Sequence, residues 1–214
     1  MGTIRQGILG GFSGKVGTVV GGSWKGISFM RAQPKSIKNP RTEKQLSQRT
    51  KFSLALVFLK PLIHVLRTGF KPYANNQSAF NAAMSYMLAN AISGDYPNYR
   101  IDFPSALISR GSLTPAMNGV AVSQDGNIVV SWDDNTGLGT AKASDKALIA
   151  LYNADRNEAV TEVAGATRAA GTQIIPIPAD WANEEVHIYL GFVSEDANNV
   201  ATSVYLGKTT IASL

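Results

Sequence analysis

Apolar and polar positions alternate with a period of two in the first part of the chain. The segment Lys15–Val20 is rich in β-branched residues, and the later segment SWKGISFMRAQ shows the same period. Gly21-Gly22 lies between them and can supply the positive φ angles of a tight turn. We therefore predict a β-hairpin from about Gly14 to Gln33. A two-stranded hairpin alone is marginally stable in water, so this one must pack on its own chain or on a partner.

A helical period replaces this pattern after residue 38. Asn39-Pro40 and Thr42 are alternative helix starts, and the helical pattern continues towards Leu66. Pro61 lacks an N–H group and forces a kink or a restart. A second helix is predicted over about 77–92, where apolar residues recur at intervals of three and four.

Short strands separated by turn residues fill the last 110 or so residues. The runs are SALISRG (105–111), GNIVVSW, KALIALYN, AVTEVA, TQIIPIP, EVHIYLGFV and ATSVYLGKTTI. Seven such runs are typical of a two-sheet sandwich of the fibronectin or immunoglobulin type. We expect Trp132 to be buried with Ile128 and Val130 on one strand face, and the Tyr189 hydroxyl to tie a corner loop.

The predicted fold class is α+β with three regions. A basic, glycine-rich β-hairpin arm covers 1–38, and a helical pair covers 39–96. An all-β sandwich, like fibronectin type III or immunoglobulin domains, covers 102–214. The proline-rich, aperiodic segment near 97–104 marks the last boundary.

Charge is distributed unevenly along the 214 residues. The net charge is +5, yet residues 1–72 carry +12 and residues 73–214 carry −7. A basic end of this kind can contact nucleic acid, an anionic membrane surface, or the acidic body of a neighbouring copy. The longest apolar run, 52–66, is interrupted by Lys60 and Pro61 and is too short to span a bilayer.

The glycine-rich segment does not fit a phosphate-binding loop. A P-loop needs G-x-x-x-x-G-K-[S/T], but Leu9 replaces the first glycine and Val16 replaces the hydroxyl residue. Its flanks also favour strands rather than a strand–loop–helix unit. We interpret these glycines as allowing sharp turns and close backbone packing.

The remaining residues suggest no catalytic set. The chain has no cysteine, and its two histidines, His64 and His187, are isolated from each other and from any metal-binding motif. No serine, histidine and acid combination stands out. We therefore expect no enzymatic activity, no cofactor and no bound metal.

Basic and aromatic residues cluster in the hairpin and the first helix. Such a combination can contact phosphates and stack bases, or it can meet an acidic surface in an assembly. The candidates for partner docking or nucleic-acid contact are Lys15, Trp24, Lys25, Phe29, Arg31, Lys35, Lys38, Arg41, Lys44, Arg49 and Lys51.

The N-terminal motif carries a family resemblance. The stretch GGFSGKVGTVVGGSWKG, followed by NPRTEKQ, resembles an uncharacterised family of Bacteroidota and their phages. More loosely, it is similar to the start of small phage structural proteins. The resemblance covers nearly the whole chain and implies a setting near virions or mobile elements. It implies no activity and no catalytic residue.

These observations favour a non-enzymatic structural or assembly protein, phage-derived or virion-associated, that docks through its basic hairpin and helices. Its expected partners are further copies of itself or other structural proteins. The alternative is a nucleic-acid-binding accessory protein that uses the same basic region. A third option is an exported surface adhesin. Because no signal-peptide pattern follows the first residues, we expect synthesis in the cytoplasm, with the virion as a second location.

Overall fold

The computed structural model describes residues 2–4, 7, 10–24, 26–36 and 41–212. The chain forms two compact units, the N-terminal unit (Met1–Thr42) and the body (Glu43–Leu214), and each is described by itself. The candidates Lys25 and Lys38, and the predicted Asn39-Pro40 helix start, lie outside the described residues.

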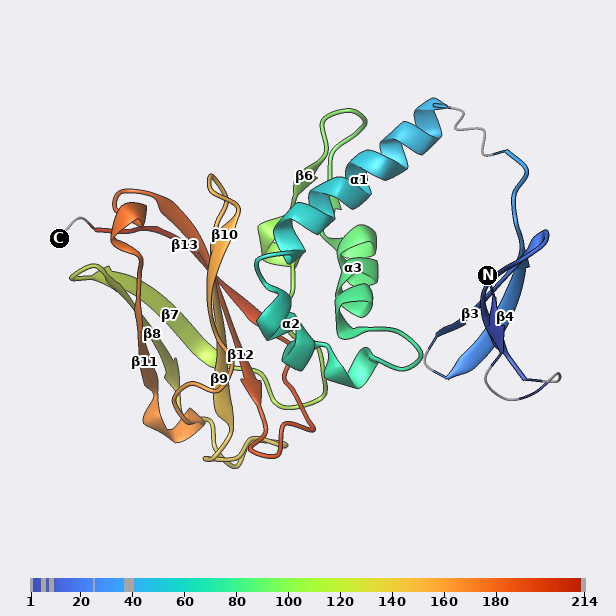
Figure 1. Cartoon of the computed structure of the whole chain (residues 1–214). Helices are drawn as coiled ribbons and strands as arrows, with labels where there is room; N and C mark the ends of the chain where they lie inside the picture. Colours follow the sequence, from blue (N-terminus) through green and yellow to red (C-terminus); the bar gives the residue numbers. More distant parts are fainter. Residues whose placement is uncertain (1, 5–6, 8–9, 25, 37–40, 213–214) are drawn as a thin grey trace. The chain divides into compact units, whose positions relative to one another are not determined.

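The N-terminal unit is an antiparallel sheet in which each strand pairs with the next one along the chain (Figure 1). Its strands are β1 (Thr3–Ile4), β2 (Phe12–Val16), β3 (Val19–Trp24) and β4 (Ile27–Ala32). The predicted extended conformation of this region is confirmed, and β2, β3 and β4 form two successive hairpins.

The predicted turn at Gly21-Gly22 is wrong, because both glycines lie inside β3. The turns of the hairpins contain Gly17 and Gly26, whose φ angles are 58° and 84°. Gly21 has a different role: a Cβ at this position would collide with the carbonyl oxygen and the ring of Phe12. It allows a neighbouring strand to approach, which is the second use of glycine that the sequence suggested.

The body contains the predicted sandwich of two antiparallel sheets. The four-stranded sheet has the order β10-β9-β12-β13, and the three-stranded sheet has the order β11-β8-β7. The strands are β7 (Met117–Gln124), β8 (Asn127–Asp133), β9 (Lys146–Asn153), β10 (Glu158–Glu162), β11 (Thr172–Pro176), β12 (Glu185–Val193) and β13 (Val204–Thr210). The α+β fold class is thereby confirmed.

The first strand of the sandwich is not the one that the sequence suggested. The run 105–111 is irregular beyond a 3-10 turn at Phe103–Ser105, and its Ala106 and Ile108 are fully buried in the core. The true first strand is β7, whose Asn118 and Gly119 are poor strand formers and concealed it. On β8, Ile128, Val130 and Trp132 are buried as expected.

The helices form a layer of their own in the body (Figure 1). They are α1 (Glu43–Leu59), α2 (Ile63–Gly69) and α3 (Ala79–Asn90), and a small hairpin of β5 (Ile92–Ser93) and β6 (Arg100–Ile101) follows. The chain bends by 93° between α1 and α2, which confirms the break expected at Pro61. The Ser78 side chain accepts a hydrogen bond from the Asn81 N–H and caps α3.

The helices and the sandwich share a core, because the four-stranded sheet is covered on both faces. On β9, Leu148, Ala150 and Tyr152 pack towards the helices, whereas Ala147, Ile149 and Leu151 pack towards the three-stranded sheet. Phe58 of α1 is fully buried against this sheet, and its ring centroid lies 4.8 Å from that of Tyr152. The body is therefore built of three layers.

Tyr189 of β12 also connects these layers. Its hydroxyl donates a hydrogen bond of 2.9 Å to the carbonyl oxygen of Phe103, which precedes the sandwich in the chain. The predicted tie to a corner loop of the sandwich is therefore wrong in its partner. Tyr189 instead fixes the segment that leads from the helices into the sandwich, and burial raises the pKa of its hydroxyl far above the ordinary value.

We expect Phe58→Ala to lower the free energy of unfolding by about 3–5 kcal/mol, because it opens a cavity between α1 and the sheet. Urea titration followed by circular dichroism would measure this. Phe52→Ala is the matched control, since Phe52 lies on the same helix but is 47% exposed. Equal losses in the two variants would contradict the shared core.

Candidate interaction surfaces

One face of the N-terminal sheet gathers four of the candidate residues. The strand register aligns Lys15 with Val20 and Val20 with Arg31 across β2, β3 and β4. The same face continues with the pairs Gly22–Phe29 and Trp24–Ile27. We name it the N-terminal face, made of Lys15, Val20, Gly22, Trp24, Ile27, Phe29 and Arg31.

Large apolar side chains on the N-terminal face are open to solvent. The exposed fractions are 55% for Trp24, 65% for Ile27 and 46% for Phe29. The Phe29 ring lies over Gly22, where a Cβ would approach the tip of the ring to 2.9 Å. The rings of Trp24 and Phe29 thus lie beside the basic residues Lys15 and Arg31, which are aligned across the strands.

The opposite face of this sheet is also uncovered within its own unit. Met30 is 71% exposed and Val16 is 53% exposed. Among the described residues of the N-terminal unit, only Gly21 is buried. A single sheet layer cannot bury the side chains of both its faces, so the described residues of this unit form no hydrophobic core.

The other described candidates extend beyond this face. Lys35 and Arg41 are exposed on the segment that follows β4. Lys44, Arg49 and Lys51 belong to the body, on α1, where Lys44 and Arg49 are exposed. The Lys51 ammonium lies 4.7 Å from the centre of the Tyr99 ring, a cation–π contact within the body. The structure therefore divides the candidates between two units.

Helix α1 has an apolar surface of its own. Phe52, Leu56 and Val57 are 47%, 39% and 43% exposed. Phe52 and Leu56 line a shallow depression together with Arg49. This surface lies on the body.

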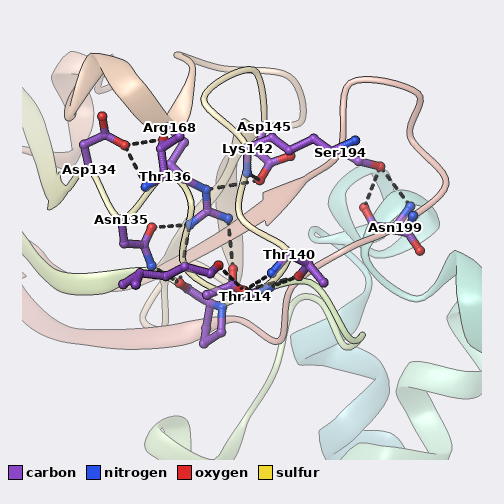
Figure 2. Close-up of polar contacts among 12 residues, drawn as sticks. Thr114, Asp134, Asn135, Thr136, Thr140, Lys142, Asp145, Arg168, Ser194 and Asn199 are labelled. Atoms are coloured by element: carbon purple, nitrogen blue, oxygen red, sulfur yellow. Dashed lines mark hydrogen bonds and ion pairs between the residues drawn. The ribbon is translucent and has the colours of Figure 1, made fainter.

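A pocket of about 590 Å³ opens between loops of the sandwich. The residues that line it carry hydroxyl, carboxylate, amide and ammonium groups, and they include Thr140, Lys142, Asp145, Ser194 and Asn199 (Figure 2). The sequence analysis missed this pocket, because its residues come from loops that no local pattern links.

Arg168 is the centre of the contacts beside this pocket (Figure 2). Its side chain is fully buried, and its guanidinium lies 3.8 Å from the centre of the Phe192 ring. It donates to Asp145 Oδ2 at 3.1 Å, to Asn135 Oδ1 at 2.6 Å and to the Thr114 carbonyl oxygen at 2.9 Å. These bonds join three loops that are distant in the sequence.

Electrostatics support a structural role for this cluster. Burial lowers the pKa of Arg168, and the neighbouring Asp145 carboxylate counteracts that effect. The Arg168 donors are directed to protein acceptors rather than into the pocket. Within the described residues, no three or more histidine, aspartate or glutamate side chains gather in a way that could hold a metal ion.

The glycine-rich segment has the geometry of strands. Gly14 and Lys15 lie within β2, and β2 is followed by β3 rather than by a helix. The strand–loop–helix unit of a P-loop does not form here, as the sequence suggested.

The model of a family of unknown function, DUF6266, matches residues 11–207, which include most of both units. This chain belongs to the DUF6266 family. Comparison with curated proteins gives no match. The DUF6266 match begins at Gly11 and includes β2, β3 and β4 of the N-terminal sheet.

Within the described part of this DUF6266 chain, no single helix has both the length and the apolar character needed to cross a membrane. Only α1 and α2 together meet that criterion, and they are bent at 93° to each other.

We expect Arg168→Met to lower the free energy of unfolding by about 3–5 kcal/mol, because it leaves the buried Asp145 carboxylate without its ion-pair partner. Arg156→Met is the control, since Arg156 pairs with Asp180 and Glu184 near the surface and should cost much less. Chemical denaturation of both variants would compare them. A negligible effect of Arg168→Met would contradict the structural role of the cluster.

Proposed function

We propose that this DUF6266 protein is a non-enzymatic assembly protein that docks onto acidic partner surfaces through its N-terminal unit. The observation that carries the proposal is the N-terminal sheet, which exposes apolar side chains on both faces. Exposed apolar patches that are rimmed by polar residues are typical of interaction sites. Aromatic residues and arginine, which Trp24, Phe29 and Arg31 supply here, are enriched in protein interfaces.

Charge favours an acidic partner. Residues 1–42 contain seven lysines and arginines and no aspartate or glutamate. Association of two such units with each other would bring like charges together, which is unfavourable. Residues 73–214 carry −7, so a second copy of the chain offers a surface of the required sign.

The proposed phage or virion setting rests on the N-terminal motif. Its resemblance to a family of Bacteroidota and their phages supports a phage-derived or virion-associated structural protein. In such an assembly the partners are further copies of the chain or other structural proteins, and the sandwich acts as a binding or packing module.

Nucleic acid is the second candidate partner, and one observation favours it. Lys15 and Arg31 share a face with Trp24 and Phe29. In such an arrangement the basic side chains can bind phosphates and the aromatic rings can stack on nucleobases. Fluorescence anisotropy with single- and double-stranded oligonucleotides tests this alternative. Binding that weakens steeply with salt would support it, and no binding at low salt would exclude it.

We expect the chain to self-associate at low ionic strength and to dissociate towards the monomer near 1 M NaCl, where the Debye length is about 3 Å. Light scattering after size-exclusion chromatography would measure the mass. The K15E/R31E variant should be largely monomeric even at low salt, because it reverses the charge of both basic side chains on the N-terminal face.

K60E/R100E is the matched control, because both side chains are exposed on the body and the change in net charge is the same. This control should associate as the wild type does. A wild-type chain that stays monomeric at every concentration and salt would contradict self-assembly.

A further inference from the structure

The three-stranded sheet of the body has an outer face that no described helix of the body covers (Figure 1). The register aligns Val122 of β7 with Val129 of β8, and Val129 with Ile174 of β11. Val122 is 56% exposed and Ile174 is 61% exposed. Val120, on the same face of β7, is 52% exposed. An apolar row therefore crosses the whole sheet.

Acidic side chains flank this row. Within β7, β8 and β11 the only charged residue is Asp133, at the end of β8 and on the same face as Val129. Asp125 is exposed in the turn before β8. We name the surface the acceptor face, made of Val120, Val122, Val129, Asp133 and Ile174.

We propose that the acceptor face of one copy binds the N-terminal face of a second copy. This inference rests on the proposed function and specifies the acidic partner surface. The two faces match in shape, because both are sheet faces, and sheets pack face to face at about 10 Å. They also match in chemistry, since each has apolar side chains beside charged ones. The charges are basic on the N-terminal face and acidic on the acceptor face.

The complementarity shows in the order of residues along β4, an edge strand of the N-terminal sheet, and β8, the central strand of the three-stranded sheet. On β4, Ile27, Phe29 and Arg31 point to the N-terminal face. On β8, Val129 and Asp133 point to the acceptor face, with Ser131 between them. When Ile27 of one copy lies opposite Val129 of the other and the two strands run in the same direction, Arg31 of the first copy lies near Asp133 of the second. The contact thus buries apolar side chains while it pairs opposite charges.

The geometry of this contact sets the form of the assembly. Each copy offers one N-terminal face and one acceptor face, so the interface is heterologous and copies add head to tail. Each face measures about 20 Å along its strands and about 15 Å across three strands. Such a contact is at the low end of specific interfaces, and association should therefore rise with protein concentration.

Two double variants of the full chain test the pairing. W24S/F29S removes the aromatic rings of the N-terminal face, and V122N/I174N removes the apolar row of the acceptor face. All four side chains are exposed, so the variants should keep the wild-type circular dichroism spectrum. Neither variant introduces a charge. Each alone should self-associate at least about tenfold more weakly than the wild type in sedimentation velocity.

The mixture of the two variants gives the decisive result. W24S/F29S keeps an intact acceptor face, and V122N/I174N keeps an intact N-terminal face. Together they should form a 1:1 complex of twice the chain's mass of 22.8 kDa that does not grow further. L138N, which changes an exposed apolar residue elsewhere on the body, is the control and should assemble as the wild type does.

The outcomes separate this inference from the proposed function. If the wild type assembles but V122N/I174N assembles equally well, or if the mixture forms no complex, the acceptor face is not the partner surface. If the N-terminal face folds back on its own chain or binds only nucleic acid, the wild-type chain is a monomer without nucleic acid, and both proposals fail.

Discussion

A β-sheet has two faces, and the apolar side chains on each face need a layer to cover them. The four-stranded sheet of the body meets this requirement along its central strands, because α1 and α2 cover one face and the three-stranded sheet covers the other. The central strands β9 and β12 are consequently buried along almost their whole length. The helices and the sandwich therefore depend on each other, and Tyr189 and Phe58 lie at their junction.

The other two sheets meet the same requirement only in part. The three-stranded sheet is covered on its inner face, where Ile128 and Val130 are buried, and its outer face leaves Val122 and Ile174 exposed. The N-terminal sheet is covered on neither face within its own unit. The described charges of the N-terminal sheet are basic, whereas the charge on the outer face of the three-stranded sheet is acidic. Our proposal of an assembly function rests on this difference.

The contacts beside the pocket of the sandwich indicate a structural role rather than a chemical one. The buried Arg168 beside the pocket is bonded to Asp145, Asn135 and the Thr114 carbonyl oxygen. A buried guanidinium that donates to acceptors on separate loops holds these loops together.

The local sequence pattern was sufficient to predict much of the fold. The strand runs of the sandwich after its first strand, the break at Pro61 and the burial of Trp132 all follow from periodicity and from the chemistry of single residues, which act over a few positions of the chain. The excess of bases among residues 1–42 is likewise a property of the sequence alone. It led us to expect a docking end there, and this expectation stays a prediction.

The tertiary structure decided what depends on contacts between distant residues. Gly21 resembles a turn residue in sequence, and only the approach of Phe12 shows why glycine is needed there. Lys15 and Arg31 share a face because of the register of three strands, and Tyr189 finds its partner 86 positions away. Periodicity reports the conformation that a segment prefers. Register and burial are set by the layers that pack together, and these determine which residues can meet a partner.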